Sequence, residues 1–300
     1  MATTPTGTPT GTTGSAEQPP LRIALPNKGS LSQSASEMLR EAGYRQRTDS
    51  KELSLLDAAN GVEFFYLRPR DIALYVGEGT LDIGITGRDL LLDSGSKAEE
   101  VRELGFGRSR FRFAARPGTL GGLEDLAGTR IATSYVGVVR GYLEEHGIEA
   151  QVIRLDGAVE TSIQLGVADV IADVVETGST LKAAGLEIAG EVILESEAVL
   201  IRRAGEQEPQ GFEIFRRRLD GVLVARSYLM MDYDVPRDRL EAAVALTPGL
   251  EGPTISPLHR EDWVAVRAMV PQENAQQLMD DLYEVGGRAI LLTGIHACRL

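Results

Sequence analysis

A short polar turn follows an apolar stretch in the middle of the chain, and its residue types suit a phosphate group. Residues 169–175 (DVIADVV) favour a buried strand, and a helical pattern follows the turn. Thr177, Ser179 and Thr180 offer hydroxyl donors, while Gly178 lets a ligand approach the backbone. Backbone N–H groups converge at a strand-to-helix turn, and the helix dipole adds positive potential, so the turn can hold one phosphate.

Asp173 lies close to this turn, within the predicted strand. A carboxylate gains nothing from phosphate, but it accepts hydrogen bonds from neutral hydroxyls. The two features together therefore suit a phosphorylated sugar with free hydroxyl groups. The turn lacks the GxxxxGK[ST] spacing of a P-loop and its lysine. Taken alone, such a turn is weak evidence, because it is more often an ordinary helix cap.

The composition is that of an ordinary globular protein with an acidic balance. The chain has 300 residues, 43% of them hydrophobic and 25% charged, and its net charge is -13. Phosphate backbones are bound by basic faces, so nucleic acid is not expected as a partner. The single cysteine, Cys298, permits no internal disulfide. The three histidines are far apart in the sequence, and none has zinc-ligand spacing.

The N-terminal residues and the apolar runs indicate where in the cell the protein is expected. No apolar run approaches the length needed to cross a bilayer, so no membrane association is expected. Residues 1–20 are rich in threonine, glycine and proline and are predicted to be a disordered tail. They lack the basic start and apolar stretch of a secretory signal, and a cytoplasmic location is therefore expected.

Strand and helix patterns alternate from the end of this tail, which indicates an α/β fold. Residues 21–25 (LRIAL) suit a buried strand. A helix is expected to follow as far as about Ala42, with Ser30 or Ser32 as its cap. A second α/β unit is predicted to begin near Phe111.

The apolar segment at residues 197–203 follows the second unit and is expected to return to the sheet of the first. This would give two lobes with two crossovers and a cleft at the carboxyl ends of the strands, where α/β sheets bind ligands. The predicted boundaries are 21–110 plus about 190–210 for lobe I, and 111–189 for lobe II. The acidic run at residues 97–103 is predicted to be a solvated helix face.

The last quarter of the chain reads β-α-β-β-α-β, the order of a ferredoxin-like unit. This unit is predicted over residues 226–300, after a connecting helix at residues 211–225. Small sheets of this kind commonly bind regulators or pair with copies of themselves, and the fold alone does not decide between these roles.

The segment with the polar turn also resembles the signature of ATP phosphoribosyltransferases, E-x5-G-x-A-x2-I-x-D-x3-T-G-x-T-L. Every position fits: Glu160, Gly166, Ala168, Ile171, Asp173, Thr177, Gly178, Thr180 and Leu181. The blocks PNKG, FFYLRPRDIALYVGEG and DIGITGRDLL are also similar to this family, and the resemblance covers residues 21–300. The blocks LMMDYD, TPGLEGPTI and DWVAVRAMVP resemble the long form, which carries its own regulatory domain.

The resemblance implies a two-lobed catalytic core, like that of periplasmic binding proteins, and a ferredoxin-like regulatory domain. Enzymes of this family join N1 of ATP to C1 of phosphoribosyl pyrophosphate and release pyrophosphate, the first step of histidine biosynthesis. By resemblance, Glu160 and Asp173 contact the ribose hydroxyls. The nest for the 5-phosphate is then formed by Glu176, Thr177, Gly178, Ser179 and Thr180.

This chemistry needs positioning and charge neutralisation more than proton transfer. Pyrophosphate leaves as positive charge builds on the sugar, and no residue is assigned as a general acid or base. The expected cofactor is Mg2+, which bridges pyrophosphate oxygens and usually keeps several waters. No protein ligand of the metal is therefore assigned.

The other lobe is expected to supply cations to the cleft. Lys28, Arg68 and Arg88 all follow predicted strands, and the alternative for each is a solvated surface charge. Tyr135 follows the strand RIATS and could stack on adenine. Its alternative role is core packing.

The resemblance to the long form implies feedback inhibition by histidine and a homo-oligomer, with dimers associating into hexamers. Asp234 can pair with a cationic group of histidine, and Thr254 can donate to its carboxylate. Leu250, Met269 and Ala289 could wall the imidazole between subunits. Each of the five could instead belong to the core.

Two other protein classes fit parts of this pattern. Solute-binding proteins also have two α/β lobes with two crossovers, but they are exported, and no export signal is evident. A nucleotide-sensing regulator could be built on the ferredoxin-like unit, but about two hundred residues would then have no role.

Overall fold

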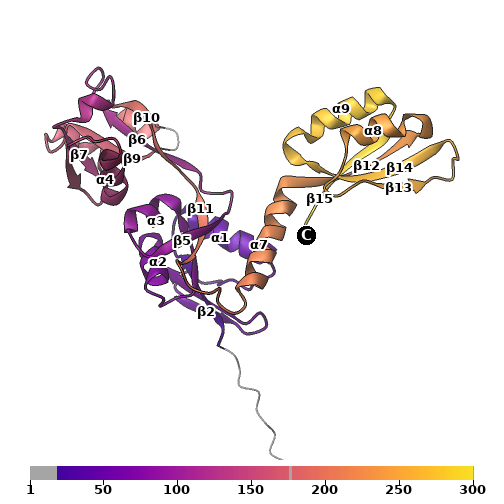
Figure 1. Cartoon of the computed structure of the whole chain (residues 1–300), viewed down its shortest axis with the longest axis horizontal. Helices are drawn as coiled ribbons and strands as arrows, with labels where there is room; N and C mark the ends of the chain where they lie inside the picture. The colour runs from indigo at the N-terminus through magenta and orange to yellow at the C-terminus, as the bar shows by residue number, and fades with distance from the viewer. Residues whose placement is uncertain (1–18, 176–177, 300) are drawn as a thin grey trace, which may run out of the picture.

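The computed structural model describes residues 19–175 and 178–299, which form three bodies with one β-sheet each (Figure 1). Most of the predicted tail, residues 1–18, lies outside the described residues. No helix in the described part of the chain is long and apolar enough to span a membrane. The fold is α/β, with two lobes built on mixed sheets and a separate antiparallel C-terminal sheet.

The first sheet has helices on both faces, as expected for strands that are apolar throughout. Its central strand pairs in parallel with both neighbours. The strand order is β2 (Ser54–Asp57), β3 (Val62–Leu67), β1 (Leu21–Pro26), β4 (Ile83–Gly87), β11 (Ala198–Arg203) and β5 (Ala98–Glu103). The helices are α1 (Ser30–Glu41), α2 (Pro69–Gly77) and α3 (Arg88–Ser94).

Strand β11 confirms the expected return of the chain to the first sheet, where it lies antiparallel between β4 and β5. Strand β5 corrects one prediction, because the acidic run at residues 97–103 is an edge strand and not a helix face. The start of α1 corrects another. Its cap residue is Gly29, at φ +79°, and neither Ser30 nor Ser32 caps it with a side chain.

The second sheet is also covered on both faces, by α4 on one side and by α5 and α6 on the other. Its strand order is β10 (Glu187–Ser196), β6 (Ser109–Ala115), β9 (Val170–Val175), β7 (Arg130–Thr133) and β8 (Gln151–Arg154). The helices are η1 (Leu123–Leu126), α4 (Val136–Glu145), α5 (Thr161–Gln164) and α6 (Ser179–Ala183). Strand β10 pairs with β6, so the chain leaves this sheet at Ser196, later than the predicted boundary of 189.

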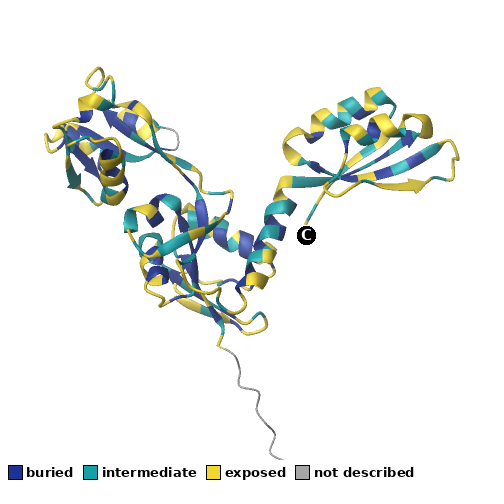
Figure 2. Ribbon diagram, viewed as in Figure 1, coloured by how far each residue is buried: buried dark blue, intermediate teal, exposed yellow. Residues whose placement is uncertain are grey.

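Helix α7 (Phe212–Ser227) joins the first body to the C-terminal one (Figure 1). Its apolar face belongs to the core of the first body, through Phe212, Phe215 and Leu219. All three residues are fully buried. Figure 2 shows buried and exposed positions along this helix as it runs toward the third sheet.

The C-terminal sheet has the strand order β13-β14-β12-β15 with all neighbours antiparallel, which is the ferredoxin-like arrangement. Alternate residues of β12 and β14 pack under the helices and leave the opposite face open. The elements are β12 (Tyr228–Pro236), η2 (Arg237–Arg239), α8 (Leu240–Leu246), β13 (Thr254–Pro257), β14 (Trp263–Pro271), η3 (Gln272–Asn274), α9 (Ala275–Val285) and β15 (Arg288–Gly294).

Candidate active site

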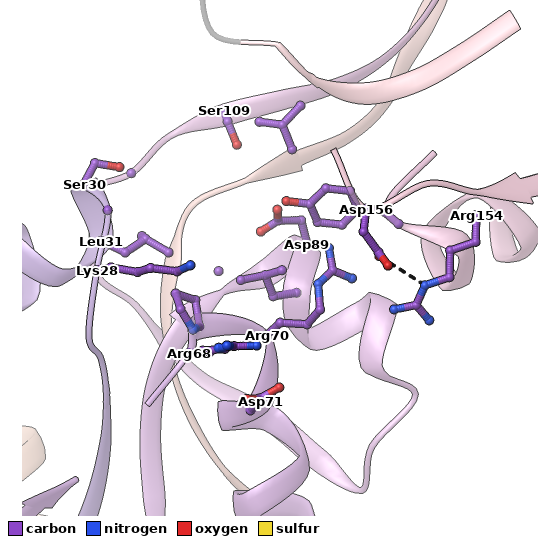
Figure 3. Close-up of a pocket in the computed structure, with 17 residues that line it drawn as sticks. Lys28, Ser30, Leu31, Arg68, Arg70, Asp71, Asp89, Ser109, Arg154 and Asp156 are labelled. Atoms are coloured by element: carbon purple, nitrogen blue, oxygen red, sulfur yellow. Dashed lines mark hydrogen bonds and ion pairs between the residues drawn. The ribbon is translucent and has the colours of Figure 1, made fainter. Parts of the chain in front are cut away.

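A cavity of about 870 Å³ lies between the two lobes. Lobe I contributes the loop after β1, the first turn of α2 and the start of α3, while lobe II contributes the ends of β7, β8 and β9. These are carboxyl ends of parallel strands, where α/β folds place their ligands. Figure 3 shows the lining side chains converging from both lobes.

Lobe I supplies three cations to this cavity. Lys28 follows β1, and Arg68 and Arg70 lie at the start of α2, where Pro69 holds the first helical position. Lys28 and Arg68 are exposed, and neither forms an ion pair within the described part of the chain. They are therefore available to phosphate oxygens. Figure 3 shows Lys28 and Arg68 reaching into the same space beside Arg70.

Tyr135 faces these cations from lobe II, directly before α4. Its ring packs edge-on against Phe111, with centroids 5.2 Å apart, and the Arg70 guanidinium lies 4.9 Å from its centroid. Burial raises the pKa of the Tyr135 phenol, and the hydrogen-bonded carboxylate of Asp89 raises it further. The ring thus packs against the core on one side and lines the cavity on the other, and its stacking on adenine stays a prediction.

Asp89 is a buried carboxylate of this wall that the sequence analysis did not select. It is 8% exposed and lies in the first turn of α3. The Ser196 hydroxyl donates to its Oδ1 at 2.8 Å and accepts its backbone N–H at 3.0 Å. Because Ser196 ends β10, this contact links the start of α3 to one of the crossovers between the lobes.

Asp173 lies near the end of β9, where its Oδ1 accepts the Val174 N–H at 2.7 Å. Burial raises the pKa of its carboxyl group, and the negative charges of Glu160 and Asp89 act in the same direction, while Arg70 lowers it. The structure therefore brings Asp173 and Glu160 into one electrostatic environment with Asp89 and Arg70. Hydrogen bonds from donors of a substrate would stabilise the ionised form of this carboxylate, and sugar hydroxyls are such donors.

The nest for phosphate is described in part. Gly178 precedes α6 in the left-handed conformation, at φ +71°, which favours glycine. Ser179 and Thr180 open the helix and are exposed. Glu176 and Thr177 lie outside the described residues.

Arg88 does not line the cavity with Lys28 and Arg68. Its guanidinium binds Glu100 at 2.7 and 2.8 Å and Glu103 at 2.6 Å, and both are residues of the unpredicted edge strand β5. These carboxylates raise the pKa of Arg88 and neutralise its charge. Arg70, and not Arg88, is the third lobe I cation that lines the cavity.

Other lining residues were also missed by sequence reasoning. Arg154 ends β8, and its Nε lies 3.3 Å from Oδ1 of Asp156, also in the cavity wall (Figure 3). Arg154 is the last residue of β8 and Asp156 follows that strand, so a position at the carboxyl end of a strand was the available signal. Within the described residues, no three acidic, histidine or cysteine side chains gather to hold a metal by themselves.

The predicted histidine-site residues lie on the C-terminal body. Strand register places Asp234, Met269 and Thr254 on the open face of the sheet, since Asp232 pairs with Arg267 and Arg267 pairs with Thr254. The other two residues lie at the margins of this face. Leu250 precedes β13 and is 37% exposed, and Ala289 has φ +49° at a register shift of β15.

Comparison with known proteins agrees with this geometry. The sequence model for ATP phosphoribosyltransferase matches residues 68–221, and the model for the HisG C-terminal domain matches residues 225–297. The chain belongs to the ATP phosphoribosyltransferase family. It has the long form, because the match to the C-terminal domain model covers the ferredoxin-like sheet.

Relatives within the ATP phosphoribosyltransferase family match almost the whole chain. The enzyme of Streptomyces avermitilis is 66% identical and that of Streptomyces coelicolor 65%, each over 93% of this chain and 100% of the relative. A solved structure of the ATP phosphoribosyltransferase HisG:HisZ complex from Thermotoga maritima has a chain that is 27% identical. The two align with a TM-score of 0.59 over 68% of this chain and 98% of that one.

Proposed function

We propose that the interlobe cavity transfers the phosphoribosyl group of phosphoribosyl pyrophosphate to N1 of ATP, giving 1-(5-phosphoribosyl)-ATP and pyrophosphate. This is the first step of L-histidine biosynthesis. The observation that carries the proposal is the meeting of two surfaces in one cavity. Lys28 and Arg68 reach in from lobe I, and Tyr135 faces them from lobe II. Membership of the family supplies the reaction.

Each substrate has a complementary part of the site. The 5-phosphate binds the turn before α6, where Gly178 permits close backbone approach and Thr180 offers a hydroxyl. The ribose hydroxyls donate to Asp173 and Glu160. Adenine lies against Tyr135, and the phosphate chains of the substrates extend toward Lys28 and Arg68.

The reaction exchanges one bond for another at C1 of the ribose. The C1–O bond to pyrophosphate breaks, and the lone pair of adenine N1 forms the new N–C1 bond. Because N1 attacks with its lone pair, no residue has to remove a proton from it. Asp173 and Glu160 lower the energy of positive charge on the sugar, and the lobe I cations bind the departing oxygens. Holding both substrates in one cavity supplies the orientation.

The residues of this site suit a Mg2+ ion that is bound mainly by the substrate. Asp173, Glu160 and Asp89 interact electrostatically, and their carboxylates could accept hydrogen bonds from waters on the ion. When bound, Mg2+ would neutralise charge on the pyrophosphate. The protein residues would contribute orientation and outer contacts.

Histidine is proposed as an inhibitor that binds the open face of the C-terminal sheet. Asp234, Thr254 and Met269 share this face, and Leu250 and Ala289 flank it. An exposed sheet face with alternating polar and apolar residues also suits contact with further copies of the chain, in dimers that associate into hexamers. We place this activity in the cytoplasm, where ATP and phosphoribosyl pyrophosphate are metabolites.

A turnover assay tests the proposed reaction directly. Purified protein is mixed with ATP, phosphoribosyl pyrophosphate and Mg2+, and pyrophosphate release and the nucleotide product are followed. Omission of either substrate, or addition of a chelator, should abolish both signals. Pyrophosphate release that does not require ATP would indicate hydrolysis, and absence of turnover with all three present would refute the proposal.

A further inference from the structure

Asp93 bridges the two lobes with its two carboxylate oxygens. Its Oδ2 accepts from Nη1 of Arg70 at 2.6 Å, within lobe I. Its Oδ1 accepts the backbone N–H of Gly137 at 2.7 Å, from lobe II. The Asp93 side chain is only 11% exposed, although Gly137 is exposed and the Arg70 side chain is 37% exposed. One carboxylate therefore fixes a side chain of lobe I to a helix of lobe II.

The helix that receives this contact has no cap of its own. The cap position of α4 is Tyr135, which makes no side-chain cap bond, and the first turn of α4 contains no acidic residue. The first N–H groups of a helix need acceptors, and a carboxylate there also interacts favourably with the helix dipole. Asp93 supplies that acceptor from the other lobe. The start of α4 thus depends on lobe I for its capping.

Gly137 allows the lobes to come this close. A Cβ built at Gly137 would lie 2.6 Å from the backbone oxygen of Asp93, and such a contact forces something to shift. Gly141, one turn later in the same helix, would accept a Cβ with nothing within 4 Å. The close approach is therefore specific to one glycine of α4.

Asp93 holds one residue that lines the cavity and one that lies close to another lining residue. Arg70, its ion-pair partner, lies 4.9 Å from the ring centroid of Tyr135. Tyr135 lies two residues before Gly137 and faces the same cavity. The position of Asp93 thus determines how the wall from lobe I meets the wall from lobe II.

We infer that Asp93 is a positioning residue for the transfer reaction. It sets the separation of the lobes at the Arg70–Tyr135 side of the cavity, and thereby the placement of one substrate relative to the other. Asp93 itself does not line the cavity, so it acts through Arg70 and α4. The inference rests on the proposed assignment of this cavity as the substrate site.

A pair of glycine variants tests the inference without removing any side chain. Alanine ordinarily favours a helix over glycine, so Gly141→Ala should have an unchanged or higher melting temperature. Gly137→Ala places a Cβ against the backbone of Asp93, so its melting temperature should be lower, and a native circular dichroism spectrum shows that it still folds. Gly137→Ala should lower kcat/KM at least tenfold, because its Cβ separates the lobes. Gly141→Ala should stay within twofold of the parent. If Gly137→Ala also stays within twofold, the close approach has no catalytic role and the inference fails.

Substitution of Asp93 tests the bridge from its other end. Asp93→Asn keeps an oxygen for Gly137 but loses the charge that holds Arg70, and Asp93→Ala loses both. We expect kcat/KM to fall from the parent to Asp93→Asn and further to Asp93→Ala, which should be reduced at least thirtyfold. The circular dichroism spectra of both variants should match that of the parent. Small-angle scattering should show a larger maximum dimension for Asp93→Ala without substrates. Loss of activity with unaltered scattering would overturn the positioning role.

Failure of this inference can be told apart from failure of the proposed function. The parent protein alone decides the function, since it must convert ATP and phosphoribosyl pyrophosphate to products. The variants decide the inference only in a parent that turns over. If the parent is active and both Gly137→Ala and Asp93→Ala have near-normal kcat/KM, the proposed function stands and the positioning role of Asp93 is refuted.

Discussion

The hydroxyl of Ser196 donates to Oδ1 of Asp89 at 2.8 Å, in a contact where both residues are at least 92% buried. The same hydroxyl accepts the backbone N–H of Asp89 at 3.0 Å. Ser196 ends β10 and Asp89 begins α3, so the pair joins a crossover strand to the cavity wall. A buried carboxylate requires such partners, because an unsatisfied one is costly.

Ser196→Ala should therefore destabilise the protein by about 1–3 kcal/mol, since Asp89 loses a donor inside the fold. The free energy of unfolding in urea is the measurement. Ser227→Ala is a suitable control, because the Ser227 hydroxyl donates to the Leu223 carbonyl on an exposed part of α7. Equal unfolding midpoints for the two variants would show that the buried pair contributes little.

Asp173→Asn should weaken phosphoribosyl pyrophosphate far more than ATP. Losing a charged acceptor for the ribose hydroxyls should cost on the order of 1.5–3 kcal/mol. Substrate affinities from calorimetry, measured separately for each substrate, check this difference. Equal weakening of both substrates would point to a structural role for this carboxylate.

The raised pKa of Asp173 predicts a pH dependence with a definite sign. Its pKa lies above the ordinary value of 3.8 because burial disfavours the charged form. Folding stability therefore falls as the pH rises from the ordinary pKa toward the folded-state pKa, because the buried carboxyl group resists ionisation. The ionised form is the one that we expect to accept hydrogen bonds from the ribose hydroxyls. Asp173→Asn should keep or raise the melting temperature at pH 7.5. It should also remove an acid limb from the pH profile of kcat/KM for phosphoribosyl pyrophosphate.

Thr180→Ala should lower kcat/KM at least tenfold, or about 1.4 kcal/mol of transition-state binding, with little change in melting temperature. The Thr180 side chain is exposed, so its removal leaves no cavity. Thr119→Ala is the matched control, since Thr119 is an exposed threonine of the same lobe that lies outside the turn before α6. Gly178→Val is less informative, because φ +71° strains any side chain at Gly178 and would reduce stability as well.

The sequence predicted best what is local along the chain. Asp173 and the strand that contains it occupy one short segment, and the buried strands at residues 21–25 and 197–203 were also predicted. Strands β6 and β10 were not predicted, although both contain apolar residues. Strand β5 was missed because its acidic residues match a solvated helix face equally well. In the structure those charges are balanced from other elements, since Glu99 pairs with Arg202, and Glu100 pairs with Arg88.

Contacts between distant segments could not be predicted in this way. Asp93 and Gly137 are 44 residues apart, and only the packing of α3 against α4 brings them together. The same applies to Asp89 and Ser196, which are 107 residues apart. Arg88 follows a strand as Lys28 does, but only the fold shows that two glutamates bind its guanidinium.

The last prediction concerns inhibition by histidine. Asp234 lies on the open face of the C-terminal sheet, half-buried, with Ala265 and Arg288 as its strand neighbours. A carboxylate on this face can bind the α-ammonium or the imidazole of histidine. The site is separate from the interlobe cavity, so inhibition would be a coupling between two sites through subunit arrangement.

Asp234→Ala should keep catalysis within twofold and raise the histidine concentration needed for half-inhibition at least tenfold. Asp238→Ala, an exposed aspartate on η2, should leave both unchanged. In the parent, saturation with either substrate alone should not relieve inhibition, because histidine does not occupy the cavity. If histidine competes simply with ATP, and Asp234→Ala is inhibited as strongly as the parent, histidine binds in the cavity and the C-terminal sheet is not its site.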